Sequence, residues 1–149
     1  MKEFFCTACG VVGGTIAAAF GGWDAALATL VICMALDYVT GLIVAAVFHN
    51  SPKTPTGGLE SRAGYKGLIR KGMMLAVVLV ACRLDLVMGS TFIRDGVIIA
   101  FVANEVLSIV ENAGLMGVPI PSVITSAIEV LRHRSEEHVD EDHSGDSPA

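Results

Sequence analysis

Charged residues are scarce in this sequence: they make up 17% of its 149 residues, against 53% hydrophobic residues and a mean hydropathy of +0.64. A soluble domain of this length needs a more polar surface, so the composition indicates a membrane protein built as one compact unit. Its 10 basic residues do not outnumber its 15 acidic residues. A nucleic-acid-binding protein of the usual basic kind is therefore excluded.

Catalytic and metal-binding patterns are also missing. The chain has no internal repeat, no phosphate-binding loop and no nucleophile beside a general base, so we predict neither an enzyme nor a cofactor. Cys6-x-x-Cys9 has the spacing of a redox or metal motif, but no second pair accompanies it. We interpret the four cysteines as small apolar residues. His133, His138 and His143 recur every five residues and share no helix face, so no metal site is predicted.

What the sequence does contain is long apolar runs. We predict an all-α integral membrane protein with about four transmembrane helices, at residues 4–20, 25–48, 72–92 and 96–116. The first run is short and also fits a signal peptide with a weak cleavage site near residues 17–19. We prefer a retained helix, because closely spaced glycines and alanines suit tight helix contact.

Two further segments follow the last apolar run. Residues 117–121 contain two prolines that stop the helix, and Ser122 resembles an N-cap. Residues 122–131 are amphipathic but too short to cross a bilayer, so a helix on the membrane surface is expected. Residues 132–149 hold six acidic and two basic residues, the composition of a disordered cytoplasmic tail. The predicted division is thus a transmembrane domain over 1–131 and a tail over 132–149.

The segment between the second and third apolar runs is basic. It contains one acidic residue, Glu60, and five basic residues: Lys53, Arg62, Lys66, Arg70 and Lys71. Such an excess keeps a short loop in the cytoplasm, and four spans then place both termini there as well. Residues 59–71 fit either a short interfacial helix or an ordinary solvated loop.

Polar residues mark one face of the run over 96–116. At about 100° per residue they fall within an arc of roughly 120°; they are Asn104, Glu105, Ser108, Glu111 and Asn112. An acid at the centre of a membrane helix costs about 2.5–3.5 kcal/mol on insertion scales. This face should therefore contact other helices or water, which predicts helices that assemble around a polar seam, in an oligomer or around a pore.

The second run carries a single acid near its middle. Asp37 shares a helix face with Thr40 and Gly41, and Gly41 with Ala45 forms a small-xxx-small pair suited to helix packing. By these bounds Asp37, Arg83 and Glu105 lie at about the same depth in the bilayer. We expect Arg83 to pair with one of the two acids; the alternative is that Arg83 extends toward the membrane surface.

Four motifs together resemble the toxin-secretion/phage-lysis holin family. They are Asp37-Tyr-Val-Thr-Gly41, Ser61-x-x-Gly64-x-x-Gly67-x-x-x-Lys71, Asn104-Glu-x-Leu-Ser-Ile-x-Glu-Asn112 and Gly117-x-Pro-Ile-Pro121. The resemblance spans roughly residues 25–131. It implies a phage protein that accumulates in the lipid bilayer of the host cytoplasmic membrane, forms a homo-oligomer and opens lesions that release an endolysin or toxin. Two alternatives stay open: a small ion channel or transporter subunit, and an antiholin that delays lysis.

Overall fold

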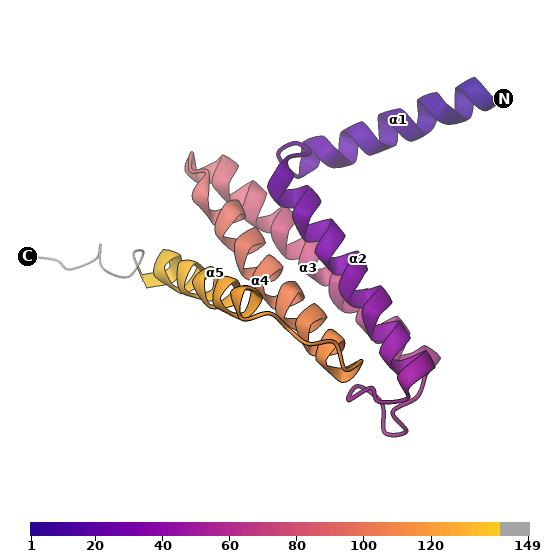
Figure 1. Cartoon of the computed structure of the whole chain (residues 1–149). Coiled ribbons are helices and arrows are strands. Elements are labelled where there is room, and N and C mark those ends of the chain that lie inside the picture. Colours follow the sequence, from indigo (N-terminus) through magenta and orange to yellow (C-terminus); the bar gives the residue numbers. More distant parts are fainter. Residues whose placement is uncertain (141–149) are drawn as a thin grey trace, which may run out of the picture.

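The computed structural model describes residues 1–140 of the chain and forms helices throughout, without a strand in that part (Figure 1). The predicted all-α class is confirmed. The helices are α1 (Lys2–Ala19), α2 (Ala25–Ile43), its π-helical continuation η1 (Val44–Phe48), α3 (Ser61–Met88), α4 (Phe92–Leu115) and α5 (Ser122–Asp140).

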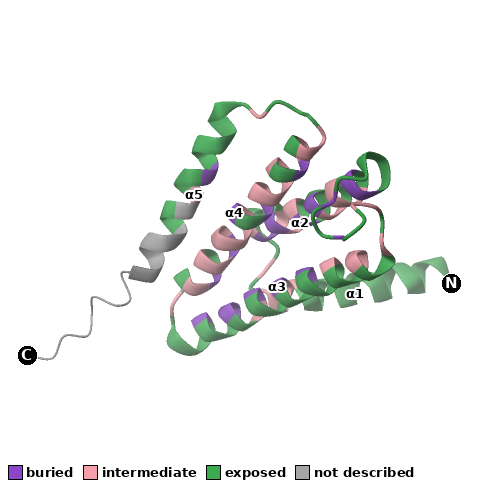
Figure 2. Cartoon of the chain, turned by 90° about the horizontal axis from the view of Figure 1, so that it is seen from below, coloured by how far each residue is buried: buried purple, intermediate pink, exposed green. Residues whose placement is uncertain are grey.

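Helix α4 lies at the centre of a bundle, where it packs against α2, α3 and α5. Buried residues lie along the facing sides of these helices, as the purple segments in Figure 2 show. The apolar core is supplied by α2, α3 and α4; it consists of Leu27, Leu30, Met34, Met74, Val78 and Ile98. The outer faces of the same helices carry large exposed apolar side chains.

Helix α1 stands apart from this bundle (Figure 1). None of its residues is buried. The turn to α2 passes through Gly21 and Gly22, both with positive φ, and Asp24 then caps α2 by accepting a hydrogen bond from the backbone N–H of Leu27 at 2.9 Å. An apolar helix without a packing partner in its own chain requires lipid or another protein to cover it.

The segment between η1 and α3 folds back on itself. His49 adopts a left-handed conformation that ends the helix, and the backbone N–H of Ser51 donates to the carbonyl of Gly57 at 2.9 Å. Gly57 has φ +72°, and a Cβ there would lie 2.3 Å from the carbonyl oxygen of His49. Only glycine fits this position, so the segment has a defined shape.

Two predicted boundaries are wrong around α3. Most of the basic segment 59–71 and of the apolar run 72–92 forms one continuous helix, because no proline separates them and the helix continues through Gly72. The next helix begins at Phe92 instead of residue 96. The cause is Asp85 of α3, whose carboxylate accepts hydrogen bonds from the backbone N–H groups of Ile93 (3.2 Å) and Arg94 (2.8 Å). This contact between helices caps α4.

Helix α5 also departs from the prediction. It continues past residue 131 to Asp140, so the expected disorder is wrong up to that residue, and the remainder of the predicted tail lies outside the described residues. The helix packs along α4. Ile128 is buried, and Leu131 lines a hollow together with Ala25 and Ile98. The middle of α5 thus lies on the side of the start of α2, at the opposite end of the bundle from the segment 49–60.

Candidate functional site

A cluster of polar side chains occupies the interior of the bundle, between α2, α3 and α4. The Lys71 ammonium donates to the carboxylate of Asp37 at 2.8 Å and also to that of Glu105. The other oxygen of Asp37 accepts hydrogen bonds from the hydroxyl of Ser108 at 2.6 Å and the amide of Asn112 at 3.2 Å. We call these five residues the polar cluster. The polar cluster contains one lysine and two carboxylates, so the formal charge of the cluster is −1.

Burial of the charged side chains increases the free-energy cost of breaking these ion pairs. The side chains of Lys71, Asp37 and Glu105 are 11%, 9% and 4% exposed. Removing one partner of such a pair leaves a buried charge without compensation, which typically costs about 3–5 kcal/mol. The polar cluster therefore holds three helices in one arrangement.

Helical periodicity explains why Lys71 of α3 lies in the polar cluster. Lys71, Met74, Val78 and Asp85 are all buried and follow each other at helical spacing. On α2, Gly41 leaves room for the neighbouring helix, since a Cβ there would lie 3.7 Å from the Asn112 amide nitrogen. That amide also donates to the hydroxyl of Thr40 at 2.9 Å, while Ala45 is buried further along the helix.

The expected pairing of Arg83 with Asp37 or Glu105 is wrong. Arg83 is exposed on α3, and Lys71 takes the place between the two acids. The residue spacing accounts for the difference, because position 83 falls outside the buried face that contains positions 71, 78 and 85. The basic composition of residues 59–71 indicated an interfacial helix or a solvated loop, whereas the register of Lys71 with the buried apolar residues of α3 could have identified its inward position.

The polar face of α4 divides into two groups. Glu105 and Asn112 are buried and Ser108 is half-buried, all three in the polar cluster. Asn104 and Glu111 are exposed and line a cleft beside it. The predicted polar face of α4 therefore contacts the interior of the bundle through three of its residues and the open cleft through the other two.

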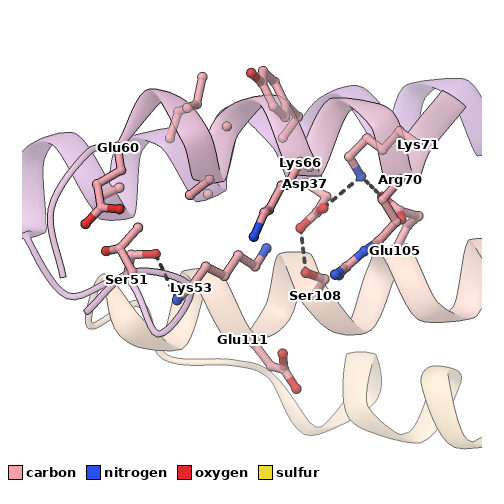
Figure 3. Close-up of a pocket in the computed structure, with 18 of the residues that line it drawn as sticks. Asp37, Ser51, Lys53, Glu60, Lys66, Arg70, Lys71, Glu105, Ser108 and Glu111 are labelled. Carbon is pink, nitrogen blue, oxygen red and sulfur yellow. Dashed lines mark hydrogen bonds and ion pairs between the residues drawn. The ribbon is translucent and has the colours of Figure 1, made fainter. Parts of the chain in front are cut away.

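The cleft has a volume of about 430 Å³ and lies between α2, α3, α4 and the segment 49–60 (Figure 3). Four of the five basic residues predicted for the cytoplasmic loop line it: Lys53, Lys66, Arg70 and Lys71. The fifth, Arg62, is exposed and does not line it. Acidic groups of Glu60 and Glu111 lie at its margins (Figure 3).

A second ionic group connects α4 to the start of α2. The Arg94 guanidinium donates to the carboxylate of Asp24 at 2.7 Å, to the carbonyl of Phe20 at 2.8 Å and to Asp95 at 3.2 Å. The hydrogen bond from Arg94, followed by that from the Leu27 N–H, holds the pKa of the Asp24 carboxyl below its usual range. No local sequence pattern identifies this group, because its contacts join positions about 70 residues apart.

These features lie within a segment that has known relatives. The sequence model of the bacteriophage holin family matches residues 14–133, a range that contains the polar cluster and the cleft. The chain belongs to the bacteriophage holin family. The resemblance found in its motifs is thereby confirmed, and the match extends further toward the N-terminus than the motifs did.

Individual relatives of the chain include one that is named a holin. A protein named a probable holin, from Bacillus phage phi105, is 32% identical over 108 residues, covering 72% of this chain and 74% of the relative. An uncharacterized protein of Clostridium perfringens is 34% identical over 118 residues, covering 78% and 82%. One of Halalkalibacterium halodurans is 31% identical over 128 residues, covering 82% and 89%. No solved structure matches this holin.

Proposed function

We propose that this holin accumulates in the host cytoplasmic membrane, forms homo-oligomers and opens lesions through which an endolysin reaches the cell wall. The observation that carries the proposal is that the bundle buries charged side chains and exposes apolar ones. The charged groups of the polar cluster are buried together. Helices α2 and α3 expose large apolar side chains, among them Ile32, Leu36, Val39, Met73, Val77 and Val80. Such a surface suits lipid or a neighbouring copy.

The transmembrane arrangement is part of the proposal. By length and composition, Ala25–Phe48 is the one helix of the described chain that is apolar enough to cross a membrane. We infer that α1, α3 and α4 also cross. The main obstacles are charges in α3 and α4, and several of them are paired inside the protein: Lys71 with Glu105, and Arg94 with Asp24. Paired charges that face other helices are tolerated in membranes.

The exposed part of the polar face is the proposed contact between copies. Asn104 and Glu111 do not take part in the polar cluster and remain accessible, so a neighbouring copy or the water of an open lesion can meet them. Labelling of single cysteines tests this in a variant lacking the native cysteines. Cysteine at position 104 or 111 should crosslink between copies or react with a soluble reagent, whereas cysteine at Leu36 should do neither. The reverse pattern would assign the contact to the apolar face.

Inducible expression beside a murein hydrolase without a signal sequence tests the function itself. We expect growth to stop abruptly and culture density to fall only when the hydrolase is present. Depolarisation without hydrolase release would instead identify a small ion channel. Delayed lysis by a second, co-expressed holin would identify an antiholin. Accumulation in the membrane, followed by immunoblotting, confirms that each variant is present.

A further inference from the structure

The cleft contains three cationic side chains without an ion-pair partner among the side chains that the structure describes. They are Lys53 from the segment 49–60 and Lys66 and Arg70 from α3. Lys66 and Arg70 are four residues apart and so share one face of the helix. Lys53 and Lys66 point toward one another in the middle of the cleft (Figure 3). Like charges that converge repel one another unless an anion lies between them.

The acidic residues that line the cleft do not fill that role. Asp37 and Glu105 share Lys71, so the polar cluster contributes one negative charge against the three cations. Glu60 accepts a hydrogen bond from the hydroxyl of Thr56 at 3.1 Å, and it lies with Glu111 at the margins, away from the two lysines (Figure 3). Three cations against one excess negative charge leave the inner part of the cleft with a net positive charge, although the four basic and four acidic side chains of the whole lining balance.

We propose that this cleft binds the phosphate group of an anionic phospholipid, through Lys53, Lys66 and Arg70. The remaining walls suit the rest of a lipid, since they include the apolar side chains Leu42, Ala45, Leu59 and Leu107. The inference rests on the proposed membrane location, which places this end of the bundle at the cytoplasmic surface. Basic pockets between transmembrane helices on that side bind anionic lipid head groups.

Binding of a lipid there has a structural consequence. Lys53 belongs to the segment 49–60, while Lys66 and Arg70 belong to the first turns of α3. A shared phosphate connects these two parts next to the polar cluster and neutralises their mutual repulsion. The content of anionic lipid then influences how firmly this end of the bundle is closed.

Native mass spectrometry of the full-length protein in mild detergent, titrated with phosphatidylglycerol or phosphatidylcholine, measures the predicted binding. We expect selective binding of phosphatidylglycerol. Its Kd should rise about fivefold in each of the variants Lys53→Gln, Lys66→Gln and Arg70→Gln, the ratio that about 1 kcal/mol per basic residue corresponds to. Lys66→Arg should bind like the unmodified protein, and helix content by circular dichroism shows whether each variant is folded.

Arg62→Gln is the matched control. Arg62 is an exposed cation of the same helix that does not line the cleft, so its loss should leave the Kd unchanged. Equal weakening by Arg62→Gln would show general attraction to charge and overturn the proposal, as would equal affinity for phosphatidylcholine. Displacement of the lipid by an equal concentration of inorganic phosphate would make free phosphate the ligand and overturn it too.

Flotation with phospholipid vesicles separates this proposal from the proposed function. A protein that floats with the vesicles but binds phosphatidylglycerol equally well in all cleft variants retains its membrane role and has no lipid site here. A protein that does not float at all contradicts the membrane location, and the lipid site with it.

Discussion

Lys71 is the residue on which the interior arrangement depends, since it compensates two carboxylates from two other helices. We expect Lys71→Gln to destabilise the bundle by about 3–5 kcal/mol, because two buried acids lose their cation. In the expression assay, less protein should accumulate in the membrane and lysis should be delayed. The double variant Lys71→Gln with Glu105→Gln should recover part of the loss, because only one acid then remains.

Arg83→Gln provides the control for that experiment. Arg83 is exposed, so its replacement should leave accumulation and lysis time near those of the unmodified holin. If Arg83→Gln were as damaging as Lys71→Gln, the ion pairing of the polar cluster would not be the cause of the effect.

Asp24 should make stability depend on pH at the other end of α2. Its folded pKa lies below the unfolded value of about 3.9, because Arg94 and the Leu27 N–H donate to its charged form. This stabilisation is fully present above that unfolded value and is lost as pH falls through the folded pKa. Asp24→Asn keeps a capping oxygen without the charge. The Tm difference between the unmodified protein and Asp24→Asn in detergent should be clear at pH 7 and shrink as the pH falls below about 3.9. A difference that does not change with pH would contradict the charge effect.

Individual residues differ in how far the sequence could predict their positions. The inward direction of Glu105, Ser108 and Asn112 follows from helical periodicity, which needs only local information. Lys71 was missed because the composition of a basic segment was given more weight than its register. Arg94 depends on contacts with Phe20 and Asp24, and no local pattern contains such a contact.

At the scale of elements, apolar runs located every helix but not their ends. The start of α4 is set by the Asp85 side chain of another helix, and the second half of α5 is charged and so lacked an apolar signal. The position of α5 along α4 also could not be predicted. An amphipathic helix can cover either a protein or a membrane surface, and its periodicity is the same in both cases.

Helix α5 leads to a prediction about movement. With a cytoplasmic C-terminus, its end should lie on the side of the segment 49–60, yet Leu131 lines a hollow together with Ala25 at the other end of the bundle. We expect α5 to swing about residues 117–121, where Gly117 has φ +78°, before lesions open. In a variant without native cysteines, Ala25→Cys with Leu131→Cys, joined by a reducible permeant thiol crosslinker, should delay lysis until reductant is added.

Single-cysteine variants treated with the same reagent are the control for this experiment and should lyse on time. Efficient crosslinking within one chain that leaves lysis timing unchanged would show that α5 remains on α4 throughout. Absence of any crosslink in membranes would instead mean that α5 has already left α4 there.

At the scale of the whole molecule, α1 is the part without a partner in its own chain. It buries no residue, and a Cβ added to Gly10 or Gly14 would meet nothing within 4 Å. These two glycines are four residues apart, the spacing that lets membrane helices approach closely. Together with the proposed oligomer, this indicates that α1 packs against α1 of another copy.

Replacing both glycines with leucine tests that contact. We expect Gly10→Leu with Gly14→Leu to shift the protein several-fold toward monomer in blue native gels and to delay lysis, because the bulky side chains keep the helices apart. The Tm of the bundle should stay unchanged, since α1 contributes nothing to its core. Ala8→Leu with Val12→Leu, which adds bulk to the opposite face of the same exposed helix, is the matched control. Equal loss of oligomer in both double variants would assign the effect to hydrophobic bulk and not to close contact at the glycines.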